Sequence, residues 1–264
     1  MKVRLKIWLP LCLLALAAAW LFWPRATSPL ADSKPSASPA PAAVANATVA
    51  PTPAASSAIA EDSAAPSAAT TNRLAFRLNN TSKPIAELTR DRHAILLENA
   101  FIDTAASLKL KIPAHLQAAG DPGAFIVQSR GALDAQFRAA IGAAGGQVIS
   151  YIPNNALLVQ ISAGGAAALA ENSRVQAVLP YEPYYKVSST LLGRAVKQQP
   201  LADGTFLTLG LYDRGAEATL AELKKLGAEI LTQERSPFGQ MVRVRPPTDW
   251  FAIAKLSGVQ LVAA

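Results

Sequence analysis

The stretch SYIPNNALLVQI, residues 150–161, predicts a strand, a tight turn and a second strand. Asparagine tolerates the positive φ that a tight hairpin needs, so Pro153, Asn154 and Asn155 mark the turn. The flanking residues are β-branched, aromatic or aliphatic, which favours strands. This hairpin lies between two Ala-rich stretches of helical character, and the same arrangement occurs a second time in the chain.

The segment from residue 204 onward repeats the segment from residue 123 onward, with an offset that drifts only from 81 to 84 residues. The extra residues fall at predicted turns. A nearly fixed period of this kind indicates two copies of one structural unit. The matched positions are Phe125 and Phe206, Gly145 and Gly227, Leu158 to Ile161 and Met241 to Val244, and Val175 and Val259.

Both copies predict the same order of elements. An apolar strand is followed by a helix with a stripe of apolar residues, a glycine that ends the helix, the hairpin, a second helix and a last strand. In the second copy, Pro246 to Asp249 is expected to start the second helix. The helix stripes are Leu133, Phe137 and Ile141 in one copy and Leu220, Leu223 and Leu226 in the other.

That order, βαββαβ in about 60 residues, is typical of the split-βαβ or ferredoxin-like unit. The sequence therefore predicts an α+β fold with two tandem ferredoxin-like domains. In each domain we expect a four-stranded antiparallel sheet with both helices on one face, and the other face open for a partner.

The N-terminus predicts export. In residues 1–25, basic residues precede an apolar run of 17 residues, 7–23, which is typical of a signal peptide. A run of this length is also at the short edge of what can span a bilayer, so a retained membrane anchor stays open. Residues 26–72 are dominated by Ala, Pro, Ser and Thr and predict a disordered linker. We expect a secreted, periplasmic or cell-envelope protein.

The remaining chain divides into four segments. Residues 73–120 predict a strand-containing extension that packs on the first repeat, residues 121–186 form that repeat, residues 187–203 are a connector, and residues 204–264 form the second repeat. The net charge is +7, but the basic residues beyond the linker are spread out rather than gathered with aromatic residues. A nucleic-acid partner is therefore not expected.

Few residues could carry catalysis. His93 and His115 are the only histidines, and Cys12, the only cysteine, lies in the apolar N-terminal run. This set is too small for a transition-metal site, so no metal or cofactor is expected. Asp103, in FIDTA, resembles the aspartate motif of subtilisin-like peptidases, but the histidine and serine motifs are missing. A triad needs all three members, so we expect a protein that is not an enzyme.

The closing strand of the first copy carries a second resemblance. NSRVQAVLPYEPYYK, residues 172–186, resembles the end of the inhibitor-type propeptides of subtilisin-like serine peptidases, in which Val-x-x-Ile/Val-x-Pro precedes an extended tail. The matching residues are Val175, Val178 and Pro180, whereas the second copy lacks the proline. The two-copy arrangement over residues 121–264 resembles the fervidolysin-like N-terminal prodomain of large secreted bacterial peptidases.

This resemblance implies a folding chaperone and peptidase inhibitor that docks an open sheet face and an extended tail on a subtilisin-like peptidase, in cis in a longer product or in trans. Either copy could supply the tail. The alternative is an envelope-tethered module that binds a protein or peptide, with the membrane as a further partner if the N-terminus stays uncleaved. The candidate tail residues are Tyr181, Glu182, Pro183, Tyr184 and Tyr185 after the first copy, and Leu261, Val262, Ala263 and Ala264 in the second.

Overall fold

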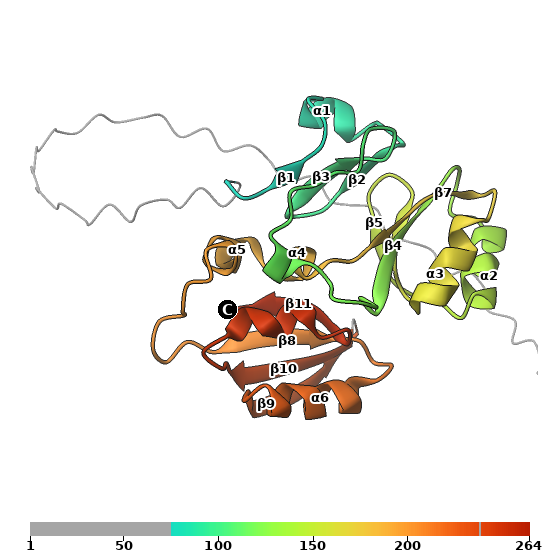
Figure 1. Ribbon diagram of the computed structural model, residues 1–264. Coiled ribbons are helices and arrows are strands. Elements are labelled where there is room, and N and C mark those ends of the chain that lie inside the picture. Colours follow the sequence, from blue (N-terminus) through green and yellow to red (C-terminus); the bar gives the residue numbers. More distant parts are fainter. Residues whose placement is uncertain (1–74, 238) are drawn as a thin grey trace, which may run out of the picture. The chain divides into compact units, whose positions relative to one another are not determined.

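The computed structural model describes residues 75–237 and 239–264, all of which belong to one compact unit of the chain (Figure 1). The predicted signal or anchor at 1–25 and the linker at 26–72 lie outside the described residues. The described part has mixed α and β structure with three small sheets, as the sequence predicted at the level of fold class. Within it, no helix is long and apolar enough to cross a membrane.

The first repeat forms a four-stranded antiparallel sheet with strand order β5-β6-β4-β7. Figure 1 shows α2 and α3 together on one face of this sheet, where Phe137, Ile141 and Leu169 complete a small core. The elements are β4 (Ala124–Ser129), α2 (Ala135–Ala143), β5 (Gln147–Ile152), β6 (Ala156–Gln160), α3 (Ala163–Ala170) and β7 (Val175–Pro180).

Local sequence explains where these elements begin and end. Asp134 caps α2, because its carboxylate accepts a hydrogen bond of 2.8 Å from the amide of Phe137. Gly145 follows α2 with a φ of 78°, the left-handed conformation expected after a helix. Asn154 and Asn155 have φ values of 66° and 61° in the turn between β5 and β6, as their side-chain type predicted.

The second repeat has the equivalent antiparallel order, β11-β8-β10-β9. Its second helix is a short 3-10 helix that begins at Trp250, rather than the longer helix expected from Pro246. Apolar residues recur there every three positions, at Trp250, Ile253 and Leu256, which matches the period of a 3-10 helix. The elements are β8 (Leu207–Leu211), α6 (Ala216–Lys225), β9 (Glu229–Ser236), β10 (Gly239–Arg245), η2 (Trp250–Lys255) and β11 (Val259–Ala263).

The residues before the first repeat form a third sheet of order β1-β3-β2, in which β1 and β3 are parallel. Gln128 of β4 ties this sheet to the first repeat. Its fully buried amide donates to the carbonyls of Arg92, Ala94 and Asn154 at 3.0 to 3.3 Å. The elements are β1 (Leu78–Asn79), α1 (Ile85–Leu88), β2 (Ala94–Leu96), β3 (Ala100–Asp103) and η1 (Ala114–Leu116).

Two helices join the repeats. They are α4 (Pro183–Lys186) and α5 (Ser189–Val196), and α5 lies in the segment predicted as a connector. Between them, Val187 forms a parallel bridge with Val262 of β11, so the joining segment runs along the edge of the second sheet. The amide of Asn99 donates to the carbonyl of Tyr184 at 3.1 Å, which fixes α4 against the third sheet as well.

Candidate partner-binding surface

In the first repeat, the sheet face expected to be open is covered. Ile126 and Leu158 point away from α2 and α3, yet both are buried, in one cluster with Ile102 of β3 and Tyr184 of α4. The physical reason is that β4 and β6 contain continuous apolar runs rather than an alternating pattern, and such strands need cover on both faces. The expectation of an open face is therefore wrong for this repeat.

In the second repeat, no described segment of the chain covers the corresponding face. The opposite face is buried under α6 and η2, where Leu209, Val242 and Ile253 are inaccessible to solvent. On the uncovered face, Met241 pairs with Gly210, which pairs in turn with Leu261, whose side chain is 37% exposed. The three residues thus form one row across the sheet.

Gly210 shapes the middle of this row. A Cβ atom at this position would lie 3.3 Å from the Leu261 Cβ and 3.8 Å from the Met241 Sδ. Without that carbon, the two apolar side chains lie close together over the backbone of β8. The uncovered face therefore has a small apolar centre.

Positive charge flanks this centre. The Arg243 guanidinium lies 4.9 Å from the centroid of the Phe206 ring, a favourable cation–π contact. Arg245 lies 6.0 Å from the same ring and forms an ion pair with Glu229. Among the described residues, Arg243 has no carboxylate partner. We call the face formed by Phe206, Gly210, Met241, Arg243 and Leu261 the uncovered face.

The candidate tail after the first copy is not extended. Tyr184 is 2% exposed, and its hydroxyl donates to the carbonyl of Phe76. Pro183 occupies the first turn of α4, a position where its missing N–H is harmless. Tyr185 is also buried, and burial raises the pKa of Tyr184 to about 12. The segment therefore belongs to the core, in contrast to the expected free tail.

The two charged residues of the same segment are removed from solvent to different extents, since Lys186 is buried and Glu182 is half-buried. Lys186 is 0% exposed, and its ammonium donates to the carbonyl of Leu256 at 2.9 Å. Burial lowers the pKa of Lys186 to about 7, partly opposed by the nearby Glu182. The Glu182 carboxylate accepts a hydrogen bond of 2.6 Å from the amide of Ala118, and burial raises its pKa above the ordinary value. Tyr181 is half-buried, and its hydroxyl donates to the carbonyl of Tyr185.

The candidate tail of the second copy lies mainly inside β11. Val262 is buried, whereas Leu261 contributes to the uncovered face. Ala263 is half-buried and Ala264 is exposed. A role of these residues as an inhibitory tail remains a prediction.

The carboxylate of Asp103 forms an ion pair with Lys83 and a hydrogen bond with the backbone. It accepts hydrogen bonds from the ammonium of Lys83 at 2.8 Å and from the amide of Ala105 at 2.9 Å. Burial alone would raise the pKa of Asp103, but these two hydrogen bonds bring it below the ordinary value. Lys83 also contacts Asp91 at 2.6 Å, so one lysine neutralises two carboxylates.

Among the described residues, neither histidine ring hydrogen-bonds to an aspartate or a serine, although the backbone amide of His93 donates to the Asp91 carboxylate at 2.9 Å. The His93 ring lies 3.4 Å from the Arg92 guanidinium, and the His115 ring lies 2.9 Å from the carbonyl of Ala195. Within the described ranges, no group of three or more His, Cys, Asp or Glu side chains is placed to hold a metal ion.

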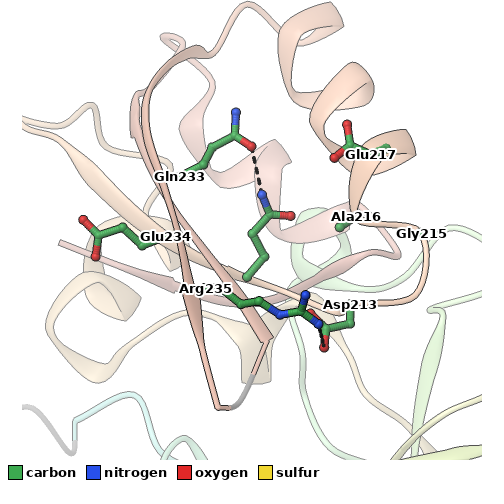
Figure 2. Close-up of a pocket in the computed structure, with 8 residues that line it drawn as sticks. Asp213, Gly215, Ala216, Glu217, Gln233, Glu234 and Arg235 are labelled. Atoms are coloured by element: carbon green, nitrogen blue, oxygen red, sulfur yellow. Dashed lines mark hydrogen bonds and ion pairs between the residues drawn. The ribbon is translucent and has the colours of Figure 1, made fainter.

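A polar pocket of about 510 Å³ lies beside the second sheet, between the start of α6 and strands β9 and β10 (Figure 2). Gln240 donates to Gln233 at 2.9 Å, and Arg235 lies 3.7 Å from Asp213. The lining contains no histidine, serine, threonine or cysteine, and its ionisable side chains are carboxylates and one arginine. The lining residues are Asp213, Gly215, Ala216, Glu217, Gln233, Glu234, Arg235 and Gln240.

The fold and these surfaces define an α+β protein with two repeated four-stranded units, of which the second has an uncovered face. In comparison with known proteins, the family described as Domain of unknown function (DUF8729) matches residues 86–182. This stretch runs from α1 through the first repeat, so it contains the third sheet's strands β2 and β3 together with the sheet they cover. No curated protein and no solved structure matches the chain.

Of the residues on the uncovered face, only Leu261 was predicted to bind a partner, whereas Phe206, Met241 and Arg243 were predicted only as equivalent positions of the two repeats. A signal was present in GQMVRVR, residues 239–245, where apolar and polar residues alternate as they do in a strand with one solvated face. The cation–π contact could not be found this way, because Phe206 and Arg243 are far apart in sequence.

Proposed function

We propose that this chain is the non-catalytic pro-region of a secreted subtilisin-like serine peptidase, and that it binds the peptidase through the uncovered face. In this proposal the two four-stranded units are ferredoxin-like domains of a fervidolysin-like prodomain. The equivalent strand orders β7-β4-β6-β5 and β11-β8-β10-β9, each with two helical segments between its strands, support that assignment.

The observation that carries the proposal is the uncovered face itself. An antiparallel sheet can have one solvated face, but that face is then normally polar. Here it presents the apolar side chains of Leu261 and Met241 beside Arg243, which has no acidic partner among the described residues. Methionine, aromatic residues and arginine are enriched in protein–protein interfaces, which supports a protein partner.

The proposal places the protein outside the cytoplasm, exported by residues 1–25, with the peptidase supplied in cis or in trans. It requires no cofactor. The first repeat, whose sheet is covered on both faces, supports the second repeat and does not itself dock on the peptidase.

Inhibition of a peptidase tests the proposal. The full chain is titrated into a bacterial subtilisin-like peptidase while hydrolysis of a peptide substrate is followed. We expect tight inhibition that weakens at least tenfold in Arg243→Glu and in Leu261→Asp, because both put a carboxylate on the uncovered face. Arg138→Glu, an exposed change on α2, is the matched control and should inhibit like the unchanged protein.

Deletion of either candidate tail is a poor test, because both segments contain buried residues, Tyr184 in one and Val262 in the other. Point changes on the uncovered face leave this core intact. Equal inhibition by Arg243→Glu and the unchanged protein would overturn the docking surface. No inhibition by folded protein would overturn the role as a peptidase inhibitor.

The alternative, an envelope-tethered module that binds a protein or peptide, is favoured by one observation. Tyr181 to Lys186 is folded into the core and does not provide an extended segment for an active-site cleft. A tethered module needs no such segment. Binding of the full chain to an inactivated peptidase without inhibition of the active enzyme would support this alternative.

A further inference from the structure

A second pocket, of about 260 Å³, lies between the third sheet and the first repeat, and it shares no lining residue with the uncovered face. It is formed where β2 begins, where β4 ends and where β7 begins. Its lining contains two arginines and no carboxylate. The lining residues are Arg92, His93, Ser129, Arg130 and Gln176.

Both arginines are exposed, and each guanidinium contacts a side chain other than a carboxylate. Arg130 donates to the Gln176 side-chain oxygen at 3.0 Å, and the Nε of Arg92 lies 3.4 Å from Nε2 of His93. Among the described residues, neither arginine forms an ion pair. Arg174, which is close in sequence to Gln176, differs because it pairs with Asp134 at 3.0 Å. The pocket therefore contains two positive charges that no carboxylate of the described chain neutralises.

A hydroxyl adds a further donor. Ser129 is only 3% exposed, and its oxygen accepts a hydrogen bond from the amide of Gly131, which leaves the hydroxyl proton free to be donated. The backbone around it is fixed, since the amide of Ser129 donates to the carbonyl of Asn155 at 2.8 Å and that of Arg130 to Arg174 at 2.9 Å. The donors are thus attached to a rigid strand end.

We propose that this pocket binds an oxyanion, a carboxylate or phosphate group, between the guanidiniums of Arg92 and Arg130, with the Ser129 hydroxyl as a third donor. A guanidinium presents several N–H donors in a planar fork that matches the oxygens of both groups. Because no carboxylate of the described residues pairs with either guanidinium, an incoming anion does not have to displace one.

All five lining residues lie within residues 86–182, the stretch that matches the family model. The site therefore belongs to the third sheet and first repeat, and it does not depend on a peptidase partner or on the second repeat. The anion-site proposal therefore stands even if the proposed function fails, and the proposed function stands even if the pocket binds no anion.

Titration with inorganic phosphate and, separately, with acetate tests the proposal. The full chain is studied at pH 7.5 and constant ionic strength, and binding is followed by NMR shifts of the arginine side chains. We expect saturable binding of at least one anion. The dissociation constant should rise at least tenfold in Arg92→Gln and in Arg130→Gln, and severalfold in Ser129→Ala.

Arg138→Gln, an exposed arginine on α2 outside the pocket, is the control and should bind like the unchanged protein. Binding of phosphate alone would indicate a phosphate-bearing ligand, and binding of acetate as well would indicate a carboxylate-bearing one. Absence of saturation with both anions, or equal affinity in the two glutamine variants of the pocket, would overturn the proposal.

Discussion

The buried ammonium of Lys186 gives a quantitative prediction of stability against pH. The side chain is fully buried, with one hydrogen bond to the carbonyl of Leu256. Burial lowers its pKa from 10.5 to about 7. A pKa difference of one is worth about 1.4 kcal/mol, so at pH 7 this lysine destabilises the folded state by about 4 to 5 kcal/mol.

The number of protons bound in each state decides whether the free energy of unfolding rises or falls with pH. Between pH 7 and pH 10.5 the unfolded chain holds a proton on Lys186 that the folded chain has lost, so the free energy of unfolding rises with pH. From pH 7 to pH 9.5 the rise should be about 3 kcal/mol. Below pH 7 both states are protonated, and the destabilisation is complete.

Lys186→Met removes the titrating group while keeping an apolar side chain of similar length. The loss of the donor to Leu256 costs about 1–3 kcal/mol. We therefore expect the variant to be about 2 kcal/mol more stable than the unchanged protein at pH 7, with the advantage gone by pH 9.5. Its own stability should not depend on pH over this range.

Urea unfolding followed by circular dichroism at several pH values measures these differences. The range from pH 7 to pH 9.5 isolates Lys186. Burial raises the pKa of Tyr184, so this side chain stays protonated in the folded state, and unfolded tyrosine, with an ordinary pKa of about 10, begins to ionise only at the top of this range. Lys225→Met, an exposed change at the end of α6, is the control. A flat pH profile for the unchanged protein, or the same slope in Lys186→Met, would refute the reasoning.

Three further predictions concern single positions. Gly164→Ala, in α3, should raise the free energy of unfolding by about 1 kcal/mol, because the added Cβ meets nothing within 4 Å. Gly165→Ala should lower it, because the added Cβ would lie 2.5 Å from a backbone carbonyl oxygen. Thermal unfolding of the two variants tests this pair, and equal shifts in melting temperature would contradict it. Gln128→Leu should cost about 3 kcal/mol in urea unfolding, since it leaves buried carbonyls without donors; an unchanged midpoint would show that the third sheet does not depend on this side chain. Asp103→Ala should lower the melting temperature, because Lys83 loses one of its two carboxylate partners, but it should leave any inhibition or partner binding unchanged. Because the pKa of Asp103 is lowered from 3.8, the difference in stability between the variant and the unchanged protein should be present above pH 4 and fade below it. A clear loss of inhibition would instead show that Asp103 is functional.

Much of each repeat could be predicted because its signals are local. Gly145 and Gly227 both adopt the positive φ that ends a helix, and Asn154 and Asn155 both do so in the hairpin. The hairpin predicted within residues 150–161 is also present, although its first strand begins at Gln147, three residues before that stretch. The repeated order of elements could be found without a structure because it depends on neighbouring residues.

The candidate site was harder to predict, because burial depends on which segments meet. Tyr181 to Lys186 contains an X-Pro pair and polar groups and was expected to be an extended tail, but tertiary contacts with Phe76 and Leu256 place it in the core. The covered face of the first sheet has the same origin. Nothing local shows that β2 and β3 pack against Ile126.

The bridge between Val187 and Val262 affects how the chain folds during synthesis. Residue 262 leaves the ribosome 75 residues after residue 187, so the segment joining the repeats must wait for β11 before its edge is paired. Contacts between positions so distant in sequence form slowly. The nascent first repeat can therefore fold early, while Val187 and the apolar residues around it stay exposed until β11 has been synthesised. During that interval a chaperone could bind the exposed segment.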